Sequence, residues 1–140
     1  MKTETDLLRA KKLLAGGASC ALVKGEKYYV SERSGIAPML EFIAKGIDLN
    51  GFSAADKIVG KAAAMLFVKA GVKEVYAEVL SEAGKKFLES HGINVSFGTL
   101  TGRIINRAGT GQCPMDECVA GIYDLDQGYA ALKAKVERKN

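Results

Sequence analysis

The residues of this sequence that could do chemistry are gathered in one segment, NRAGTGQCPMDECVAG, at residues 106–121. Cys113 is followed directly by Pro114, which suits the first turn of a helix because its missing N–H is not needed there. We therefore expect the thiol at or beside a helix N-cap, where the dipole and free N–H groups lower the pKa of a cysteine. The segment offers Cys113 as a nucleophile. A chance cysteine at a well-started helix is the plain alternative.

Charged neighbours would act on this thiol in opposite directions. Asp116 and Glu117 fall in the expected first turn, where carboxylates complement the helix dipole but raise the pKa of a nearby thiol. Arg107, six residues upstream of Cys113, would lower that pKa if the loop folds over the helix. We count Glu117 with Cys113 among the candidate catalytic residues.

The residues before Cys113 could bind a ligand. Two glycines and a threonine precede the expected helix, and such a backbone can turn its N–H groups toward an anion. The lysine of a Walker loop is absent and no G-x-G-x-x-G unit matches, so a tight turn is the other explanation. The candidate ligand-binding residues are Asn106, Arg107, Gly109, Thr110, Gly111 and, from a separate segment, Lys61.

A conventional metal site is not expected. Cys113 and Cys118 have four residues between them, which is loose for a pair of zinc ligands. Cys20 falls in an expected strand, and His91, the one histidine, precedes Gly92 at an expected helix end. We therefore expect no metal and no cofactor.

Helices and strands alternate along the chain that must hold these residues. Helices are predicted over residues 5–17, 38–46, 53–71, 81–92, 114–125 and 126–139, a hairpin over 20–30, and strands over 74–80 and 93–100. Such alternation indicates a mixed sheet covered on both faces. We predict a single α/β domain over residues 1–140.

Composition fits an ordinary globular protein, with 140 residues, 48% of them hydrophobic and 26% charged. No apolar run approaches the roughly 20 residues that span a bilayer, and the N-terminus is too polar for a secretory signal. Three cysteines, an odd number, argue for free thiols. We expect a cytoplasmic protein without a membrane partner.

The net charge of +4 could suggest nucleic acid as a partner. The excess lies at the two ends, because residues 1–12 carry a net charge of +2 and residues 133–140 a net charge of +3. Lysines in terminal helices usually form a solvated face, and no basic stripe is interleaved with aromatic residues for stacking on bases. Polymeric nucleic acid is therefore not an expected partner.

Several segments together carry a family resemblance. They read ADKIVGKAAAMLFVKAGVKEVYAEVLSE, HGINVSFGTL, IINRAGTGQCPMDECV and ERSGIAPMLEFI. From about residue 15 to about residue 130 the chain resembles the bacterial and archaeal family named domain of unknown function 1893. This resemblance implies the fold of cytidine deaminases, a three-layer α/β/α sandwich, and a homo-oligomer, since deaminase-like folds commonly associate.

The resemblance can be tested against the zinc motifs of deaminases, His/Cys-x-Glu at the start of one helix and Pro-Cys-x-x-Cys at the start of another. Pro114 and Cys118 match the second motif, but Met115 stands where its first zinc ligand belongs. The first motif falls near Asp56 and Lys57, with no His, Cys or Glu in place. The resemblance thus implies the fold without the usual zinc site, and ordinary zinc-dependent deamination is not expected.

In that fold two helix N-termini meet at the mouth of a pocket, and one would bring Asp56 and Lys57 toward Cys113 and Glu117 on the other. Cys113 would act as nucleophile while Asp56 or Lys57 positions or moves a proton; a helix cap and a surface lysine are the plain alternatives. Three functions stay open. The first is a hydrolase-like, thiol-based enzyme for a nucleoside-like, nucleotide-like or anionic small molecule. The second is a non-catalytic ligand sensor, and the third is a divergent deaminase with a metal on Asp56, Cys113 and Cys118.

Overall fold

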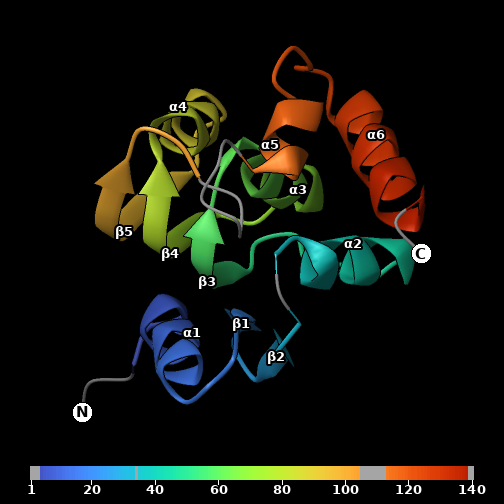
Figure 1. Cartoon of the computed structure of the whole chain (residues 1–140). Coiled ribbons are helices and arrows are strands. Elements are labelled where there is room, and N and C mark those ends of the chain that lie inside the picture. The colour runs from blue at the N-terminus through green and yellow to red at the C-terminus, as the bar shows by residue number, and fades with distance from the viewer. Residues whose placement is uncertain (1–3, 34, 105–112, 139–140) are drawn as a thin grey trace.

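The computed structural model describes residues 4–33, 35–104 and 113–138 (Figure 1). Within them the elements follow in the order α1 (Asp6–Ala15), β1 (Cys20–Lys24), β2 (Lys27–Ser31), α2 (Ala37–Ala44), β3 (Ser53–Val59), α3 (Lys61–Ala70), β4 (Glu74–Ser81), α4 (Glu82–Ser90), β5 (Asn94–Thr101), α5 (Pro114–Cys118) and α6 (Leu125–Arg138). None of these described helices is both long enough and apolar enough to cross a membrane.

The five strands form one mixed sheet in the order β2-β1-β3-β4-β5. The hairpin strands β1 and β2 are antiparallel, and β1 is also antiparallel to β3. Strands β3, β4 and β5 are parallel to one another, each connected to the next through a helix. The mixed sheet expected from the alternation of elements is confirmed.

Helices cover both faces of this sheet, which gives the three-layer α/β/α arrangement (Figure 1). On one face, α1 packs Ala10 and Leu14 against Ala21, Val23 and Ala55 of the strands. On the other face, alternate strand residues join a larger core with α2, α3, α4 and α6, centred on the buried side chains of α3. The predicted fold class is therefore confirmed.

Two of the predicted elements are wrong in part. The helix predicted over residues 53–71 begins only at Lys61, and its first half is the central strand β3. Most of β3 is buried, so the alternation of apolar and polar residues that marks a half-exposed strand is missing. Its alanines then favour a helix by propensity. The helix predicted over residues 114–125 ends at Cys118.

Candidate functional site

The parallel strands β3, β4 and β5 end along one side of the sheet, which we call the carboxyl edge. Helices α3 and α4 begin there, and after β5 the chain comes back to the same edge at Cys113. The N–H of Cys113 donates to the carbonyl of Ile104, three residues beyond the end of β5, at 2.8 Å. Ligands of open α/β sheets bind outside the carboxyl ends of the strands, so this edge is where a site is expected.

Asp116 of α5 is bound to the first turn of α3. Its Oδ1 accepts from the N–H of Ala62 at 3.0 Å, and its side chain is 5% exposed. The N-cap of α3 is Gly60, which has no side chain to cap the helix, so Asp116 supplies the missing acceptor from a distant segment. A Cβ on Gly60 would lie 2.7 Å from the Asp116 Cγ, closer than real Cβ contacts come, so this contact requires glycine.

Lys61 is held beside the same carboxylate. Its Nζ donates to the carbonyl of Ala120 at 3.0 Å and lies 4.0 Å from the centroid of the Tyr123 ring. Burial lowers the pKa of Lys61, and the nearby Asp116 opposes that shift. Burial raises the pKa of Asp116, opposed by the Ala62 N–H and by Lys61. Lys61, predicted to bind a ligand, thus holds the segment after α5 against α3.

The same edge is tightly packed where α4 begins. Ser81 caps α4 by accepting from the N–H of Gly84 at 2.9 Å. A Cβ on Gly84 would lie 3.1 Å from the carbonyl group of Gly60, which places the start of α4 directly against the start of α3. The N–H groups of Ala62 in α3 and Gly84 in α4 therefore donate to side chains of the protein itself.

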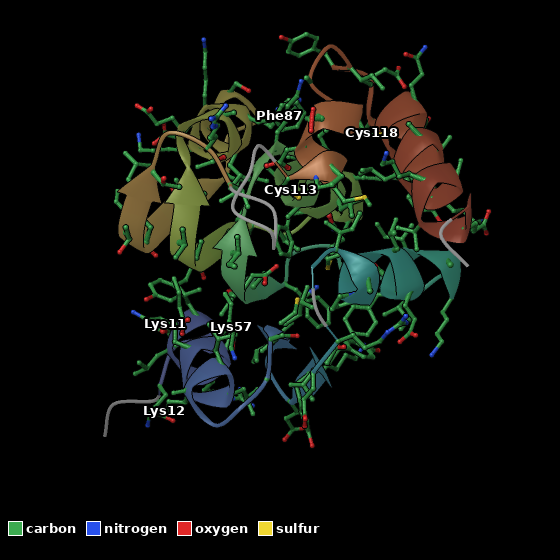
Figure 2. All side chains as sticks on the ribbon, in the orientation of Figure 1. Lys11, Lys12, Lys57, Phe87, Cys113 and Cys118 are labelled. Atoms are coloured by element: carbon green, nitrogen blue, oxygen red, sulfur yellow. The ribbon has the colours of Figure 1, made fainter. Side chains whose placement is uncertain are left out.

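Cys113 is the N-cap of α5, as the sequence predicted, with a half-buried side chain that makes no capping hydrogen bond. All three cysteines are free, Cys20 being buried in β1 and Cys118 half-buried on α5 (Figure 2). Helix α5 is only five residues long, so the strong helix dipole expected at Cys113 is not present. Glu117 is exposed, and its N–H donates to the carbonyl of Cys113 at 3.0 Å.

Asp56 and Lys57 do not lie at a helix N-terminus, so the predicted placement of both is wrong. They belong to β3, and Lys57 shares the face of Ala55, which packs under α1. Figure 2 shows the exposed Lys57 beside α1 and Cys113 beside α5, well separated. Lys57 is therefore not a partner for the Cys113 thiol.

Asp56 is buried in the middle of the sheet, directly opposite Cys20 of β1. Burial raises the pKa of Asp56 well above its ordinary range, while N–H bonds from Lys57 and Ile58 lower it and the charge of Glu78 raises it further. Burial, followed by the charge of Asp56, raises the pKa of the Cys20 thiol. Asp56 is thus an interior residue of β3, away from any helix start.

The remaining predicted ligand-binding residues, Asn106, Arg107, Gly109, Thr110 and Gly111, lie outside the described residues. Among the residues that are described, no three His, Cys, Asp or Glu side chains are gathered closely enough to hold a metal ion. Asp56, Cys113 and Cys118 all belong to the described part. A metal site built from these three side chains is therefore not formed.

Sequence reasoning placed Asp116 in a first turn but missed its contact with the start of α3, and it missed Gly60 altogether. A local signal for Gly60 exists, because a glycine separates the strand from the run Lys61–Ala64. No local pattern reports the contact with Asp116, since the hydrogen bond joins residues 54 positions apart.

Comparison with known proteins identifies relatives of the chain. The family model described as "Domain of unknown function (DUF1893)" matches residues 9–136. The crystal structure of a DUF1893 family protein from Thermotoga maritima superposes with a TM-score of 0.84 at 26% identity, covering 96% of this chain and 92% of that one.

A more distant structure is a diaminohydroxyphosphoribosylaminopyrimidine deaminase/5-amino-6-(5-phosphoribosylamino)uracil reductase from Thermotoga maritima. It matches with a TM-score of 0.46 at 18% identity, over 66% of this chain and 35% of that one. This likeness is too weak to decide the fold or the chemistry. No curated protein matches the chain.

Proposed function

The chain belongs to the DUF1893 family, and from this premise we propose that it is a small-molecule enzyme of hydrolase type that works through the Cys113 thiol. Its site is the carboxyl edge of β3, β4 and β5. Its ligand is nucleoside-like, nucleotide-like or otherwise anionic, a class that comes from the resemblance to cytidine deaminases.

The observation that supports the proposal is a difference in hydrogen bonding among the nucleophilic side chains at this edge. Among the described residues there, the Ser81 hydroxyl caps α4 and the Thr101 hydroxyl donates to the carbonyl of Arg103 at 3.4 Å. The Cys113 thiol makes no capping hydrogen bond and is half-buried, while its backbone is fixed to Ile104. A free thiol on a fixed backbone, where α/β sheets receive ligands, is suited to nucleophilic attack.

The chemistry needs a base near the sulfur. Glu117 follows Cys113 by one helical turn and is exposed, so its carboxylate can take up the thiol proton as the sulfur bonds to an electrophilic carbon. The carboxyl group then gives this proton to the group that leaves the carbon. Water, deprotonated by the same carboxylate, displaces the sulfur, which takes the proton back and becomes a thiol again. In this proposal the Cys113 thiol loses its proton during the reaction.

A non-catalytic sensor built on the same edge is the second candidate. The sensor is favoured because the groups that would stabilise negative charge in a transition state already donate hydrogen bonds within the protein. The Ala62 N–H donates to Asp116, and the Lys61 ammonium donates to Ala120. An enzyme of this kind needs such donors free and aimed at the reacting atoms.

The thiol is tested by the rate of iodoacetamide labelling, followed at each cysteine by peptide mass spectrometry. We expect Cys113 to react fastest, because Cys20 is buried and the Cys113 side chain makes no capping hydrogen bond. Cys113→Ser should remove the fast phase. Cys118→Ser should keep it, and this variant is the matched control because Cys118 is half-buried on the same helix.

A fast phase that survives in Cys113→Ser would overturn the proposal, and so would labelling of Cys113 no faster than that of Cys118. The enzyme and the sensor are separated by a heat-shift screen of cytidine, cytidine monophosphate and inorganic phosphate. A compound that stabilises the wild type and Cys113→Ser equally, and is recovered unchanged from both, supports the sensor.

A further inference from the structure

Strand β5 (Asn94–Thr101) is one of the two edges of the sheet in the described part of the chain. It pairs with β4 on one side, and in the strand order no further strand lies beyond it (Figure 1). Six of its eight residues are exposed, among them Phe97 at 38% and Leu100 at 41%. An edge strand presents a row of N–H and C=O groups that can pair with another strand.

The sequence of β5 lacks the devices that keep edge strands from pairing. It reads NVSFGTLT, with no charged residue and no proline over its eight residues. Single domains usually protect such an edge with a lysine, a proline or a short strand. In a chain of which 26% of the residues are charged, an uncharged exposed edge of this length is a feature that a partner strand explains.

The other edge of the sheet, strand β2, is shorter than β5 and carries charge. Strand β2 has five residues, begins with Lys27 and directly follows Glu26 in the hairpin turn. An antiparallel pair of β2 strands would bring these charges into the ladder of both copies. The two edges are therefore not equivalent, and β5 is the one suited to pairing.

We propose that β5 pairs antiparallel with β5 of a second copy of this chain, so that two five-stranded sheets join into one continuous sheet. In such a two-fold contact, if residue i of the first copy lies opposite residue j of the second, then residue j of the first copy lies opposite residue i of the second. An uncharged strand meets its own copy without any like-charge contact, which would otherwise destabilise the ladder.

The ends of the strand are complementary in charge under this symmetry. Arg103, exposed, follows the carboxyl end of β5, and the amino end of β5 follows the C-terminus of α4. Glu89 of α4 is already paired with Lys85 at 3.1 Å, so the negative charge left at this end is that of the α4 carbonyl groups. Antiparallel pairing brings the Arg103 end of each copy toward the α4 end of the other. A cation is stabilised near the negative end of a helix dipole, so the second copy fits better than a parallel or unrelated strand.

The test is analytical ultracentrifugation of the full chain at high micromolar concentration, with variants at both edges. We expect the wild type to sediment at twice the chain mass of 14.9 kDa. Thr99→Lys adds a charge to the exposed face of β5 in both copies and should weaken the dimer by about tenfold or more. Tyr28→Lys on β2, 59% exposed in the wild type, is the matched control and should leave the dimer intact.

Amide hydrogen exchange of the wild type keeps the test independent of how the variants fold. The amides of β5 should become more protected as the protein concentration rises, while those of β2 do not change. A wild-type monomer at high micromolar concentration, or β5 protection independent of concentration, would overturn the proposal. So would loss of the dimer in Tyr28→Lys but not in Thr99→Lys.

Discussion

At the scale of single residues, the carboxyl edge depends on one glycine and one carboxylate. Gly60 leaves room for Asp116, and Asp116 accepts the Ala62 N–H that the glycine cannot cap. The carboxylate fills the position that an anionic ligand would take at a helix N-terminus. The start of α3 is therefore occupied by a contact within the protein, and our proposal assigns ligand chemistry at this edge to Cys113.

Gly60→Ala tests this contact. The added methyl group would overlap the Asp116 carboxylate, so we expect a loss of about 1–3 kcal/mol in the free energy of unfolding, the usual cost of overpacking. Urea denaturation measures it. Gly121→Ala is the matched control, since no atom lies within 4 Å of a Cβ there, and its unfolding free energy should change little. Equal effects of the two substitutions would contradict the contact.

Asp56 makes a second prediction at this scale, concerning pH. Its pKa is higher in the folded protein than its ordinary value of 3.8, so its contribution to stability is fully present below that value. The contribution is lost as pH rises through the raised pKa, because the folded state then has to bury the charge. From about pH 4 to pH 7, Asp56→Asn should therefore gain stability relative to the wild type, by at most about 1.4 kcal/mol per pH unit.

Urea denaturation at several pH values measures the difference between Asp56→Asn and the wild type. Glu26→Gln provides the control, because Glu26 is exposed in the turn between β1 and β2. A difference that stays flat across the range, or that reverses, would show that the Asp56 carboxyl is not buried as described.

At the scale of elements, the first turn of α3 is capped by a side chain of another helix, α5. Most helices cap themselves locally, as α4 does with Ser81 and α1 with Thr5. The start of α3 has no side-chain cap of its own and depends on α5, which Lys61 also holds through Ala120. The short α5 is thus stable because of its contacts with α3, since a helix of five residues is not stable alone.

Asp116→Ala removes this shared cap and should lower the free energy of unfolding by about 1 kcal/mol, within the range for lost N-caps. Asp116→Asn keeps an oxygen that can accept from Ala62 and should lose less. Hydrogen exchange should show faster exchange at Ala62 in Asp116→Ala than in Asp116→Asn. Identical exchange at Ala62 in the two variants and the wild type would mean that Asp116 does not cap α3.

Local signals predicted several of these elements correctly, and their success has a physical reason. The pair Cys113–Pro114 marked the start of α5 because proline has one favourable place in a helix. The turn around Gly25 marked the hairpin, where the glycine adopts a positive φ of 61°. The start of α3 was missed because β3 is mostly buried and rich in alanine. The residues before Gly60 therefore lack the alternation of apolar and polar side chains that marks a half-exposed strand.

At the scale of the whole molecule, the order of elements predicted a mixed sheet covered on both faces and the family resemblance implied the three-layer α/β/α sandwich, but neither predicted the composition of the site. Asp56 and Lys57 were assigned to the site through an assumed helix start, and β3 carries Lys57 to the α1 face. Contacts such as that of Asp116 with α3 join distant segments, and no spacing along the sequence reports them. Of the predicted catalytic residues that the structure describes, Cys113 and Glu117 adjoin the carboxyl edge.

The most direct test of the account is protection of Cys113 from iodoacetamide, with cytidine, cytidine monophosphate and inorganic phosphate as separate probes. We predict that at least one probe slows labelling of Cys113 in the wild type while the rate at Cys118 stays unchanged. The carboxyl edge is contradicted as the ligand site if no probe changes the rate at Cys113, or if both cysteines are slowed alike.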